Sequence, residues 1–301
     1  MIGSSRIGAL CLVEQGKAPQ FDAGHSIDIL KQAERAAQNI DSVDFNTVDL
    51  DEMSLLYLAN AGTGVGGARP KALLQDHGRY YLAKFNRLTQ DAYNNARVEL
   101  ACLNMAKAAG VDMKNGEVVS GINGREVLLL DRFDIVNGGG RYHLVTANGL
   151  SKEPSSQQDP GRVFRYDNVC ELLRLFSISI EQDLKHLLAL MLFNRAINNT
   201  DDHERNFSLI NRGAGYQLAP AYDLVPSLVS GEYHAAGFGL NPDPPKPSEA
   251  GKLGKIFGLP KTAVADIADR VVDAVSRWES FAEQAGVNED DVVRIERCLQ
   301  L

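Results

Sequence analysis

A polar segment lies between a long apolar helix and a short hairpin, and this arrangement constrains the fold more than any other feature. Residues Glu181–Asn198 carry leucine, methionine and isoleucine on one broad face at helical spacing, which predicts a buried helix. The polar segment Asn199–Asn206 follows directly. Residues Phe207–Leu218 are typical of two short strands around a glycine-containing turn, and Asp223 comes just after them. Helix, polar loop, hairpin and acidic residue therefore form one continuous stretch of predicted structure.

The spacing within this stretch matches the needs of phosphoryl transfer. A kinase must hold an acceptor hydroxyl in line with the γ-phosphate, and must hold Mg²⁺ against the phosphate oxygens. Protein kinases use an Asp for the hydroxyl and an Asn five positions later for a metal ion, and a second metal-binding Asp follows. Asp201 and Asn206 have this separation, and Asp223 follows the hairpin. The pattern indicates a phosphoryl-transfer site that uses ATP and Mg²⁺.

Two other interpretations of the polar segment stay open at this point. Asp and Asn gather at helix ends and in turns because their side chains bond to nearby backbone groups. A hydrolytic metal centre could instead use Asp201, Asp202 and His203. The metal centre lacks a second histidine cluster, and Asp223 at the end of an apolar strand favours a functional site over turn chemistry alone.

A glycine cluster at Gly62–Gly67 is the second candidate element. It contains the pattern Gly-x-Gly-x-x-Gly, which also occurs in dinucleotide-binding folds, where a strand precedes it and a helix follows. Here a predicted helix over 49–60 precedes the cluster and a strand pair follows, so the sequence favours a loop that covers the phosphates of ATP. A flexible turn is the alternative. The candidate phosphate-binding residues are Gly64, Gly66 and Gly67.

A lysine inside the strand pair supports this interpretation. Gln75–Gly78 predicts a turn, and Arg79–Phe85 is an aromatic-rich strand that contains Lys84. A lysine in a strand is usually a surface residue, but kinases place the lysine that holds the α- and β-phosphates in this position. Such a lysine needs an acidic partner on the next helix, which is predicted over 91–109, and Glu99 is well placed for it.

The first half of the chain ends in a strand that predicts a hinge. Val127–Phe133 is apolar, and a glycine-rich break at 137–140 follows it. Arg132 and Phe133, at its end, are the candidate residues for contacting adenine, through backbone groups more than side chains. We therefore expect an α+β fold with two lobes. They are a mixed α/β N-lobe over 1–135 and a mostly helical C-lobe over 136–301.

Three further segments complete the expected organisation. Arg6–Val13 predicts a buried strand, and residues 27–38 predict a helix. Toward the other end, Thr262–Ala285 carries valine and isoleucine on one face. This pattern predicts one long amphipathic helix with Trp278 in the core.

Composition and charge argue against several classes of protein. The 301 residues carry a formal net charge of −8, which disfavours direct, nonspecific binding to nucleic acid. Four scattered cysteines without a Cys-x-x-Cys pair indicate reduced, buried thiols. The sequence contains neither a secretory signal nor an apolar run of membrane-spanning length. We expect a soluble, cytoplasmic protein.

Taken together and in order, these motifs resemble those of the HipA-type toxin kinases of type II toxin–antitoxin systems. The resemblance covers nearly the whole chain from about Arg6 onward. It rests on Gly66–Lys71, Tyr81–Phe85, Leu128–Asp134, Asn199–Asn206 and Leu218–Leu224, with Gly258-Leu-Pro and Arg277-Trp278 matching the family's C-terminal end.

The resemblance implies a two-lobed protein-kinase-like fold and a serine/threonine protein kinase. Asp201 would be the catalytic base, Asn206 and Asp223 would bind Mg²⁺, and Lys84 would hold the phosphates of ATP. The toxic substrates of the family are aminoacyl-tRNA synthetases, and its usual partner is a small helix-turn-helix antitoxin that binds DNA. An acidic kinase fits this division, because the antitoxin would supply the basic surface.

The chain departs from the family pattern in two places. Full-length members carry an N-terminal β-rich subdomain before the segment that begins at Arg6. This implies either a separate small protein that replaces the subdomain, or a truncated gene or fragment. Members also often place autophosphorylated serines in the glycine loop, where this chain has Thr63 and Gly64. Two other functions stay open: a small-molecule phosphotransferase, and a catalytically silent ATP-binding co-repressor that holds an antitoxin on DNA.

Overall fold

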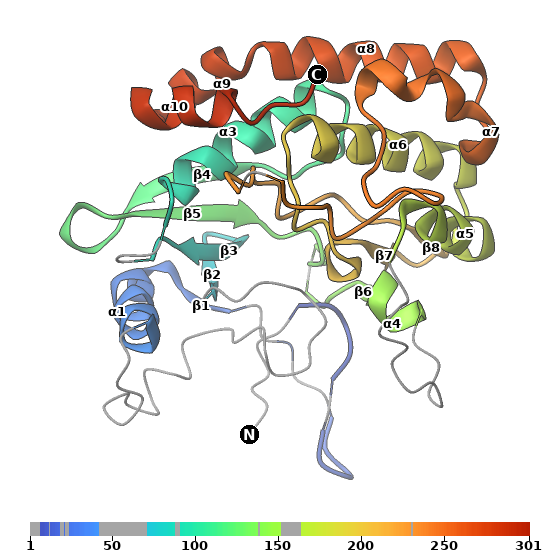
Figure 1. The fold of residues 1–301 in the computed structure, drawn as a ribbon. Coiled ribbons are helices and arrows are strands. Elements are labelled where there is room, and N and C mark those ends of the chain that lie inside the picture. Colours follow the sequence, from blue (N-terminus) through green and yellow to red (C-terminus); the bar gives the residue numbers. More distant parts are fainter. Residues whose placement is uncertain are drawn as a thin grey trace. The chain divides into compact units, whose positions relative to one another are not determined.

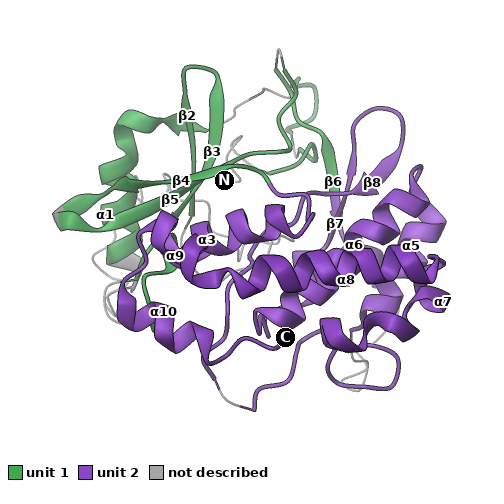
Figure 2. Ribbon diagram, turned by 90° about the horizontal axis from the view of Figure 1, so that it is seen from above, with its two compact units in different colours: residues 1–96, 114–144 green, residues 97–113, 145–301 purple. Residues whose placement is uncertain are grey.

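The computed structural model describes residues 7–11, 13–18, 21, 24–41, 71–87, 91–137, 139–151, 164–229 and 231–301. The predicted helix over 49–60 and the glycine cluster at 62–67 lie outside these residues. The chain divides into two compact units, coloured separately in Figure 2. The first unit comprises residues 1–96 and 114–144, and the second comprises residues 97–113 and 145–301.

The first unit is built on a five-stranded sheet with strand order β1-β2-β3-β5-β4. β1 pairs with β2 in parallel, and the other neighbours are antiparallel. His77 and Gly78 both have positive φ between β2 and β3, which suits the tight turn of a twisted hairpin and confirms the predicted turn. The strands are β1 (His25–Ser26), β2 (Lys71–Asp76), β3 (Arg79–Phe85), β4 (Gly116–Ser120) and β5 (Glu126–Asp131).

One helix covers this sheet with small residues. The 3₁₀ turn η1 (Ile27–Ile29) leads into α1 (Leu30–Asp41), in agreement with the predicted helix over 27–38. Three buried alanines of α1 pack against large apolar side chains of the sheet and form the core of the unit. The core is stabilised because its apolar surface is removed from water. The cluster contains Ala33, Ala36 and Ala37 of α1 and, from the strands, Leu74, Tyr81, Phe85 and Leu129.

The boundary between the units lies after residue 144, not after residue 135 as predicted. Asp134 explains the difference. Its buried carboxylate accepts hydrogen bonds from the N–H of Gly8 at 2.8 Å and from the guanidinium of Arg132, and its carbonyl accepts one from the N–H of Tyr142 at 2.7 Å. These bonds hold the segment beyond residue 135 to the first unit.

The helix α3 (Asn95–Ala108) follows Asp91 in the sequence and begins four residues later than predicted. From residue 97 onward it belongs to the second unit. Its Arg97 donates a hydrogen bond of 2.9 Å to the carbonyl of Ala285, and the N–H of Asp112, just beyond the helix, donates to His186. Contacts far along the chain therefore assign this helix to the second unit, and sequence position alone does not reveal them.

The second unit is mostly helical, as predicted. Its centre is α6 (Ile180–Ala196), whose residues from Leu187 to Phe193 are all buried, and α8 (Lys261–Ser276) packs alongside it (Figure 1). A three-stranded sheet of order β6-β7-β8 accompanies the helices. The remaining elements of this unit are β6 (His143–Thr146), α4 (Ala147–Ser151), α5 (Tyr166–Phe176), β7 (Ser208–Asn211), β8 (Tyr216–Leu218), α7 (Gly254–Phe257), α9 (Trp278–Ala285) and α10 (Glu289–Glu296), with 3₁₀ turns η4 (Glu204–Asn206) and η5 (Pro247–Lys252). A further 3₁₀ turn, η3 (Ile122–Gly124), belongs to the first unit.

Two predicted elements differ from the structure. The expected single helix over 262–285 is two helices, α8 and α9, because the chain leaves helical geometry at Arg277 (φ −97°, ψ 22°). The break lets Trp278 turn inward, where its indole N–H donates to the carbonyl of Val292 at 3.1 Å. The predicted strand over 6–13 is also wrong for the residues described there, since residues 7–11 and 13 form bends and extended chain without strand pairing.

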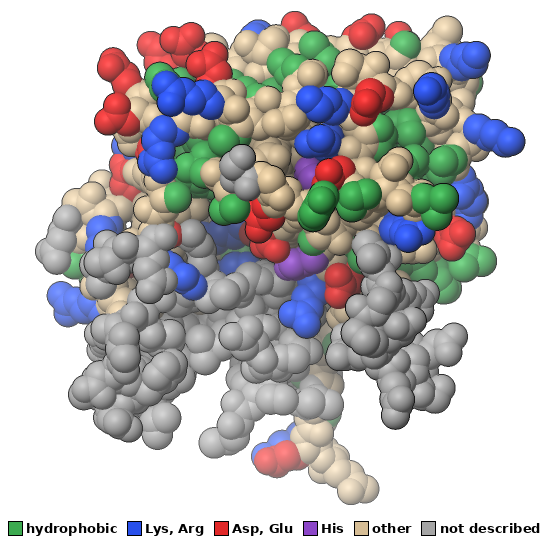
Figure 3. Space-filling model, viewed as in Figure 1, with side chains coloured by type: hydrophobic (Ala, Val, Ile, Leu, Met, Phe, Trp, Pro, Cys, Tyr) green, Lys and Arg blue, Asp and Glu red, His purple; other side chains and the backbone are tan. Residues whose placement is uncertain are grey.

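Charged side chains of both signs cover the visible described surface in Figure 3, and acidic ones gather over α9 and α10. The exposed acidic residues of these two helices include Glu279, Glu283, Glu289 and Asp290. Within the described part of the chain, none of the helices has the length and apolar character needed to cross a membrane.

The four cysteines are free, and only two of them have the burial predicted from the sequence. Cys102 and Cys170 are buried, and burial raises the pKa of the Cys170 thiol to about 12. Cys11 and Cys298 are half-buried. Because the thiolate is the reactive form, we expect only these two to react rapidly with a thiol reagent in the native protein at a pH of about 8, near the ordinary cysteine pKa.

The measurement is a thiol titration before and after denaturation. The double variant Cys11→Ser/Cys298→Ser should show no rapid reaction when native and should release both remaining thiols in denaturant. Rapid native reaction of that variant would show that Cys102 or Cys170 is accessible.

Candidate active site

The site is built where α6 ends. Asn198 lies just beyond the helix with φ +57°, a left-handed conformation that Asn tolerates better than most residues, and it turns the chain away from the helix axis. Two hydrogen bonds of 2.9 Å tie Asn198 to Ser227, one from its side-chain amide to the Ser227 carbonyl and one from the Ser227 N–H to its own carbonyl. The segment after α6 is thereby fixed against a distant part of the chain.

The next two residues extend this connection. The side-chain amide of Asn199 donates to Asn194 Oδ1 at 3.0 Å and to the carbonyl of Asp223 at 3.2 Å. The carbonyl of Thr200 accepts a hydrogen bond of 2.9 Å from the N–H of Ala235. The loop that begins at Asn199 is therefore bound to Asp223 and Ala235. These bonds bring together the two parts of the predicted motif, the loop with Asp201 and Asn206, and Asp223.

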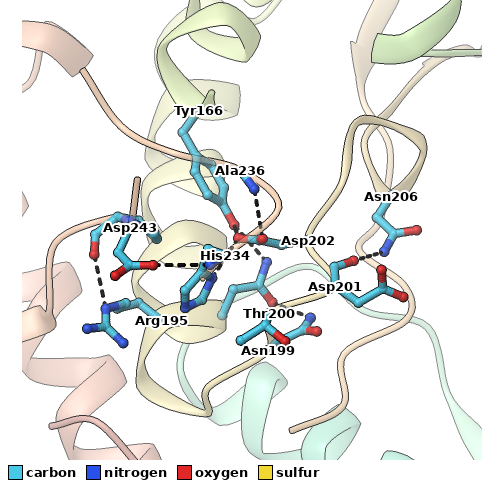
Figure 4. A network of polar contacts seen from close by, with 12 residues as sticks. Tyr166, Arg195, Asn199, Thr200, Asp201, Asp202, Asn206, His234, Ala236 and Asp243 are labelled. Carbon is cyan, nitrogen blue, oxygen red and sulfur yellow. Dashed lines mark hydrogen bonds and ion pairs between the residues drawn. The ribbon is translucent and has the colours of Figure 1, made fainter. Parts of the chain in front are cut away.

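Asp202 is the most tightly bound acidic side chain of the loop (Figure 4). Its Oδ2 accepts from the Tyr166 hydroxyl at 2.8 Å and lies 3.0 Å from His234 Nδ1, and its Oδ1 accepts from the N–H of Ala236 at 3.0 Å. Tyr166 in turn accepts from the buried amide of Asn194 at 2.9 Å. Asp202 is 1% exposed, so both of its oxygens serve the fold. This engagement contradicts the alternative in which Asp202 is a ligand of a hydrolytic metal centre.

The neighbouring Asp201 points the other way. Its side chain is 77% exposed, and its carboxylate lies 3.7 Å from His203 Nε2. Nearby protein atoms raise the pKa of Asp201 by desolvation, and an electrostatic interaction with His203 opposes the shift. Three acidic neighbours raise the pKa further: Asp223, Asp202 and Glu232. Asp201 is thus an open carboxylate in an acidic environment, able to accept a proton from a bound molecule.

Asn206 completes the loop and has an oxygen that the protein does not use. Its amide nitrogen donates to the carbonyl of Asp201 at 2.8 Å, which fixes the side chain. Its Oδ1 is buried and has no hydrogen-bond partner among the described residues. A buried acceptor without a partner costs free energy, and a hard cation would satisfy it.

Asp223 approaches this loop from the far side of the hairpin. It adopts φ +57°, an uncommon conformation that often marks a functional position. The preceding Tyr222 is anchored, because its hydroxyl donates to the carbonyl of Arg205 at 2.8 Å and lies 2.7 Å from Ser208 Oγ. Since the charge of Asp223 acts on Asp201, the acidic groups lie near one another. Asn206 and Asp223 supply oxygen ligands of the kind that Mg²⁺ prefers, so these residues fit the ion.

Lys84, the predicted phosphate-binding lysine, lies in β3 of the first unit and is 8% exposed. Directly opposite it in β2 is a second buried lysine, Lys71, which is 2% exposed. Sequence reasoning did not select Lys71 as a site residue. Counting back from the turn at His77 and Gly78 would have found it, because an antiparallel hairpin with that turn pairs residue 71 with residue 84. Two lysines on one face attract anions such as phosphates.

In the proposed hinge, the side chain of Arg132 and two backbone N–H groups already make hydrogen bonds within the fold. The guanidinium of Arg132 is buried and binds both carboxylate oxygens of Asp134, at 2.9 and 2.8 Å. The N–H groups of Asp131 and Arg132 donate to the carbonyls of Asn115 and Tyr80. The Arg132 side chain therefore shapes this segment, and a contact with adenine through Phe133 stays a prediction.

Two other predicted groups stay predictions. Glu99 is buried on α3, within the second unit, and its charge contributes to the raised pKa of Cys102. Lys84 belongs to the first unit, so their predicted pairing stays a prediction. Gly64, Gly66 and Gly67 lie outside the described residues.

Comparison with known proteins places this geometry in a family. Residues 63–279 match the model of the HipA-like C-terminal domain. A curated relative from Sinorhizobium fredii, named "Putative kinase Y4mE", is 29% identical over 196 residues, covering 63% of this chain and 40% of the relative. The chain thus spans less than half the length of that relative.

Two solved structures share the fold. HipA of Shewanella oneidensis MR-1, solved with HipB and its operator DNA, aligns with a TM-score of 0.66 at 17% identity over 98% of this chain and 74% of that one. The Helicobacter pylori proinflammatory kinase CtkA aligns with a TM-score of 0.57 at 14% identity, covering 79% and 90%. The predicted α+β, kinase-like fold is confirmed.

The two adjacent aspartates should respond differently to the same substitution. Asp202→Ala removes the acceptor of three buried groups and should lower the free energy of unfolding by about 3–5 kcal/mol. Asp201→Ala removes an exposed side chain and should change it by less than about 1 kcal/mol. Urea unfolding followed by circular dichroism measures both. Equal losses in the two variants would contradict the assignment of Asp202 to the fold and of Asp201 to the site.

Proposed function

This chain belongs to the HipA-like C-terminal domain family, and on that premise we propose that it is an ATP- and Mg²⁺-dependent serine/threonine protein kinase of the toxin type. The observation that carries the proposal is the contrast between two neighbouring aspartates. Asp202 is buried and fully hydrogen-bonded, whereas Asp201 presents an open carboxylate beside the unused oxygen of Asn206. A purely structural turn has no need for a buried acceptor without a hydrogen-bond partner, such as the oxygen of Asn206.

The reaction assigns one role to each residue. The acceptor hydroxyl oxygen forms a bond to the γ-phosphorus of ATP, the bond to the ADP oxygen breaks, and the hydroxyl proton passes to Asp201. Lys84, with Glu99 as its predicted partner, would hold the phosphates, and the glycine loop with Gly64, Gly66 and Gly67 would cover them. When bound, Mg²⁺ supplies the positive charge that offsets the charge on the phosphate oxygens.

Asn206 and Asp223 would hold that ion from opposite ends of the hairpin. The amide nitrogen of Asn206 is already bound to the Asp201 carbonyl, so its oxygen is oriented without further ordering. The anchored hydroxyl of Tyr222 limits the movement of Asp223. Such preorganised groups lose little conformational entropy when ligand binds.

We infer the proposed partners from the family and from the net charge of the chain. HipA of Shewanella oneidensis was solved in complex with HipB and operator DNA, and we propose a comparable small helix-turn-helix antitoxin for this chain. A net charge of −8 fits a kinase whose partner supplies the basic DNA-binding surface. The proposed protein substrate is an aminoacyl-tRNA synthetase in the cytoplasm.

Asp201→Asn tests the proposed reaction directly. The substitution keeps the size of the side chain and removes its ability to accept the proton, so transfer should fall by about 10²–10⁴-fold. The measurement is transfer of labelled phosphate from ATP with Mg²⁺ to proteins of a cell lysate. Asp290→Asn on the exposed surface of α10 is the matched control and should transfer phosphate as the unsubstituted chain does.

The outcomes separate the proposed kinase from its alternatives. Labelling of one or a few protein bands, lost in Asp201→Asn, supports a protein kinase. Labelling confined to a small metabolite indicates a small-molecule phosphotransferase. A folded chain that binds ATP and labels nothing indicates a silent co-repressor.

Asn206 can be tested by binding alone. Asn206→Ala removes the orphaned oxygen and should raise the Mg²⁺ concentration needed for half-maximal binding of an ATP analogue by about 10-fold or more, within the range seen when metal-site groups are removed. Asn206→Asp keeps an oxygen ligand and should bind Mg²⁺ better than Asn206→Ala does. Calorimetric titration of the nucleotide at several Mg²⁺ concentrations gives the comparison. An unchanged Mg²⁺ requirement in Asn206→Ala would contradict the ligand role.

A further inference from the structure

A cavity of about 330 Å³ opens beside Asp201, entirely within the second unit. Its lining combines two kinds of surface. Val225, Pro226 and Val229 supply apolar surface, and the other lining residues supply oxygen atoms. The oxygen-bearing residues are Asn199, Thr200, Asp201, Ser227 and Glu232.

Glu232 is held in an ionised and oriented state. Its Oε2 accepts hydrogen bonds of 2.7 Å from Thr200 Oγ1 and of 2.7 Å from Ser227 Oγ. The hydrogen bonds from Ser227 and Thr200 lower the pKa of Glu232, so the carboxylate carries its charge at neutral pH. Both bonds fall on Oε2, and no partner for Oε1 is found among the described residues. One oxygen of an oriented carboxylate is thus left for a ligand.

Asn199 also lies in the wall of this cavity. The residue is 1% exposed, and its amide nitrogen is used by Asn194 and Asp223. Its Oδ1 is buried and has no hydrogen-bond partner in the described chain. The Glu232 oxygen that makes no hydrogen bond belongs to a negatively charged carboxylate, so the complementary ligand is a donor with positive charge.

We propose that this cavity binds a lysine or arginine side chain of the protein substrate, close to the hydroxyl that receives the phosphate, and that Glu232 determines this specificity. The inference rests on the proposed kinase function and names its substrate class. The methylene stem of the basic side chain would lie along Val225, Pro226 and Val229, as long charged side chains commonly do on apolar surfaces. Its charged end would bind the free oxygen of Glu232.

A divalent cation fits this cavity less well than a basic side chain. Mg²⁺ and Ca²⁺ require several oxygen ligands in a compact shell. One carboxylate oxygen of Glu232 already accepts hydrogen bonds from two hydroxyl groups, and part of the cavity lining is apolar. A flexible aliphatic chain that ends in a cation uses both surfaces.

The test uses pairs of serine peptides that differ only in charge. A lysine is moved through the positions that flank the serine, and each peptide is compared with its acetyl-lysine counterpart, which keeps the stem and removes the charge. Binding to the full chain is measured by fluorescence polarisation without ATP. At the best position we expect the lysine peptide to bind about 10-fold more tightly, because a charge-assisted hydrogen bond contributes on this scale.

Glu232→Gln should reduce this ratio to about one, since the amide cannot pair with the cation. Glu289→Gln on the exposed surface of α10 is the matched control and should keep the ratio. Ser227→Ala provides a second variant, because it leaves the Glu232 carboxylate and removes one of the two hydroxyls that orient it. Its ratio should fall between those of the other two variants, and thermal unfolding checks that all three are folded.

Failure of this inference and failure of the proposed function have different signatures. A charge preference that depends on Glu232, without phosphate transfer to any protein, supports the cavity assignment and contradicts the kinase. Phosphate transfer to proteins with no preference for lysine peptides overturns the cavity assignment alone. A preference that persists in Glu232→Gln, or a loss of Mg²⁺ affinity in that variant with an unchanged ratio, also overturns it.

Discussion

The candidate site depends on one buried carboxylate. Asp202 gathers a hydroxyl from α5, an imidazole and a backbone N–H from residues 234–236, and these bonds connect three distant parts of the second unit. An ionised group is buried at high cost unless its partners are well placed, so the network tolerates little rearrangement. Because Tyr166 and His234 are themselves buried, the loop after α6 is held in one position by groups that all need partners. That position directs Asp201 outward.

Backbone conformation reinforces this division of roles. Asn198 and Asp223 both adopt the left-handed region. Asn198 comes just before the loop that contains Asp202, and Asp223 comes after the hairpin that follows this loop. The strain is offset by nearby hydrogen bonds, such as those between Asn198 and Ser227. The same Ser227 orients Glu232, so the groups that fix the loop after α6 also shape the neighbouring cavity. Rigid support and an open ligand surface are therefore parts of one arrangement.

Much of this organisation was predictable because it is local in the sequence. The turn residues at 77 and 78, the periodicity of α6 and the hairpin before Asp223 depend on neighbours a few positions away. The missed or wrong features depend on distant partners. The break at Arg277 follows from burying Trp278 against Val292, and the later unit boundary follows from the bonds of Asp134 to Gly8 and Tyr142. The exposure of Cys298 likewise could not be read from its spacing.

By itself, the sequence determined which residues stand at the spacing that phosphoryl transfer requires: Asp201, Asn206, Asp223 and Lys84. Only the tertiary structure decided which of two adjacent aspartates supports the fold and which is open. It also buried Lys71 and Lys84, bound the Arg132 guanidinium to Asp134 and placed Glu232 beside Asp201. The reason is physical. Residue type and spacing indicate which chemistry the side chains can perform. The burial and hydrogen bonding of each side chain depend on groups that only folding brings together.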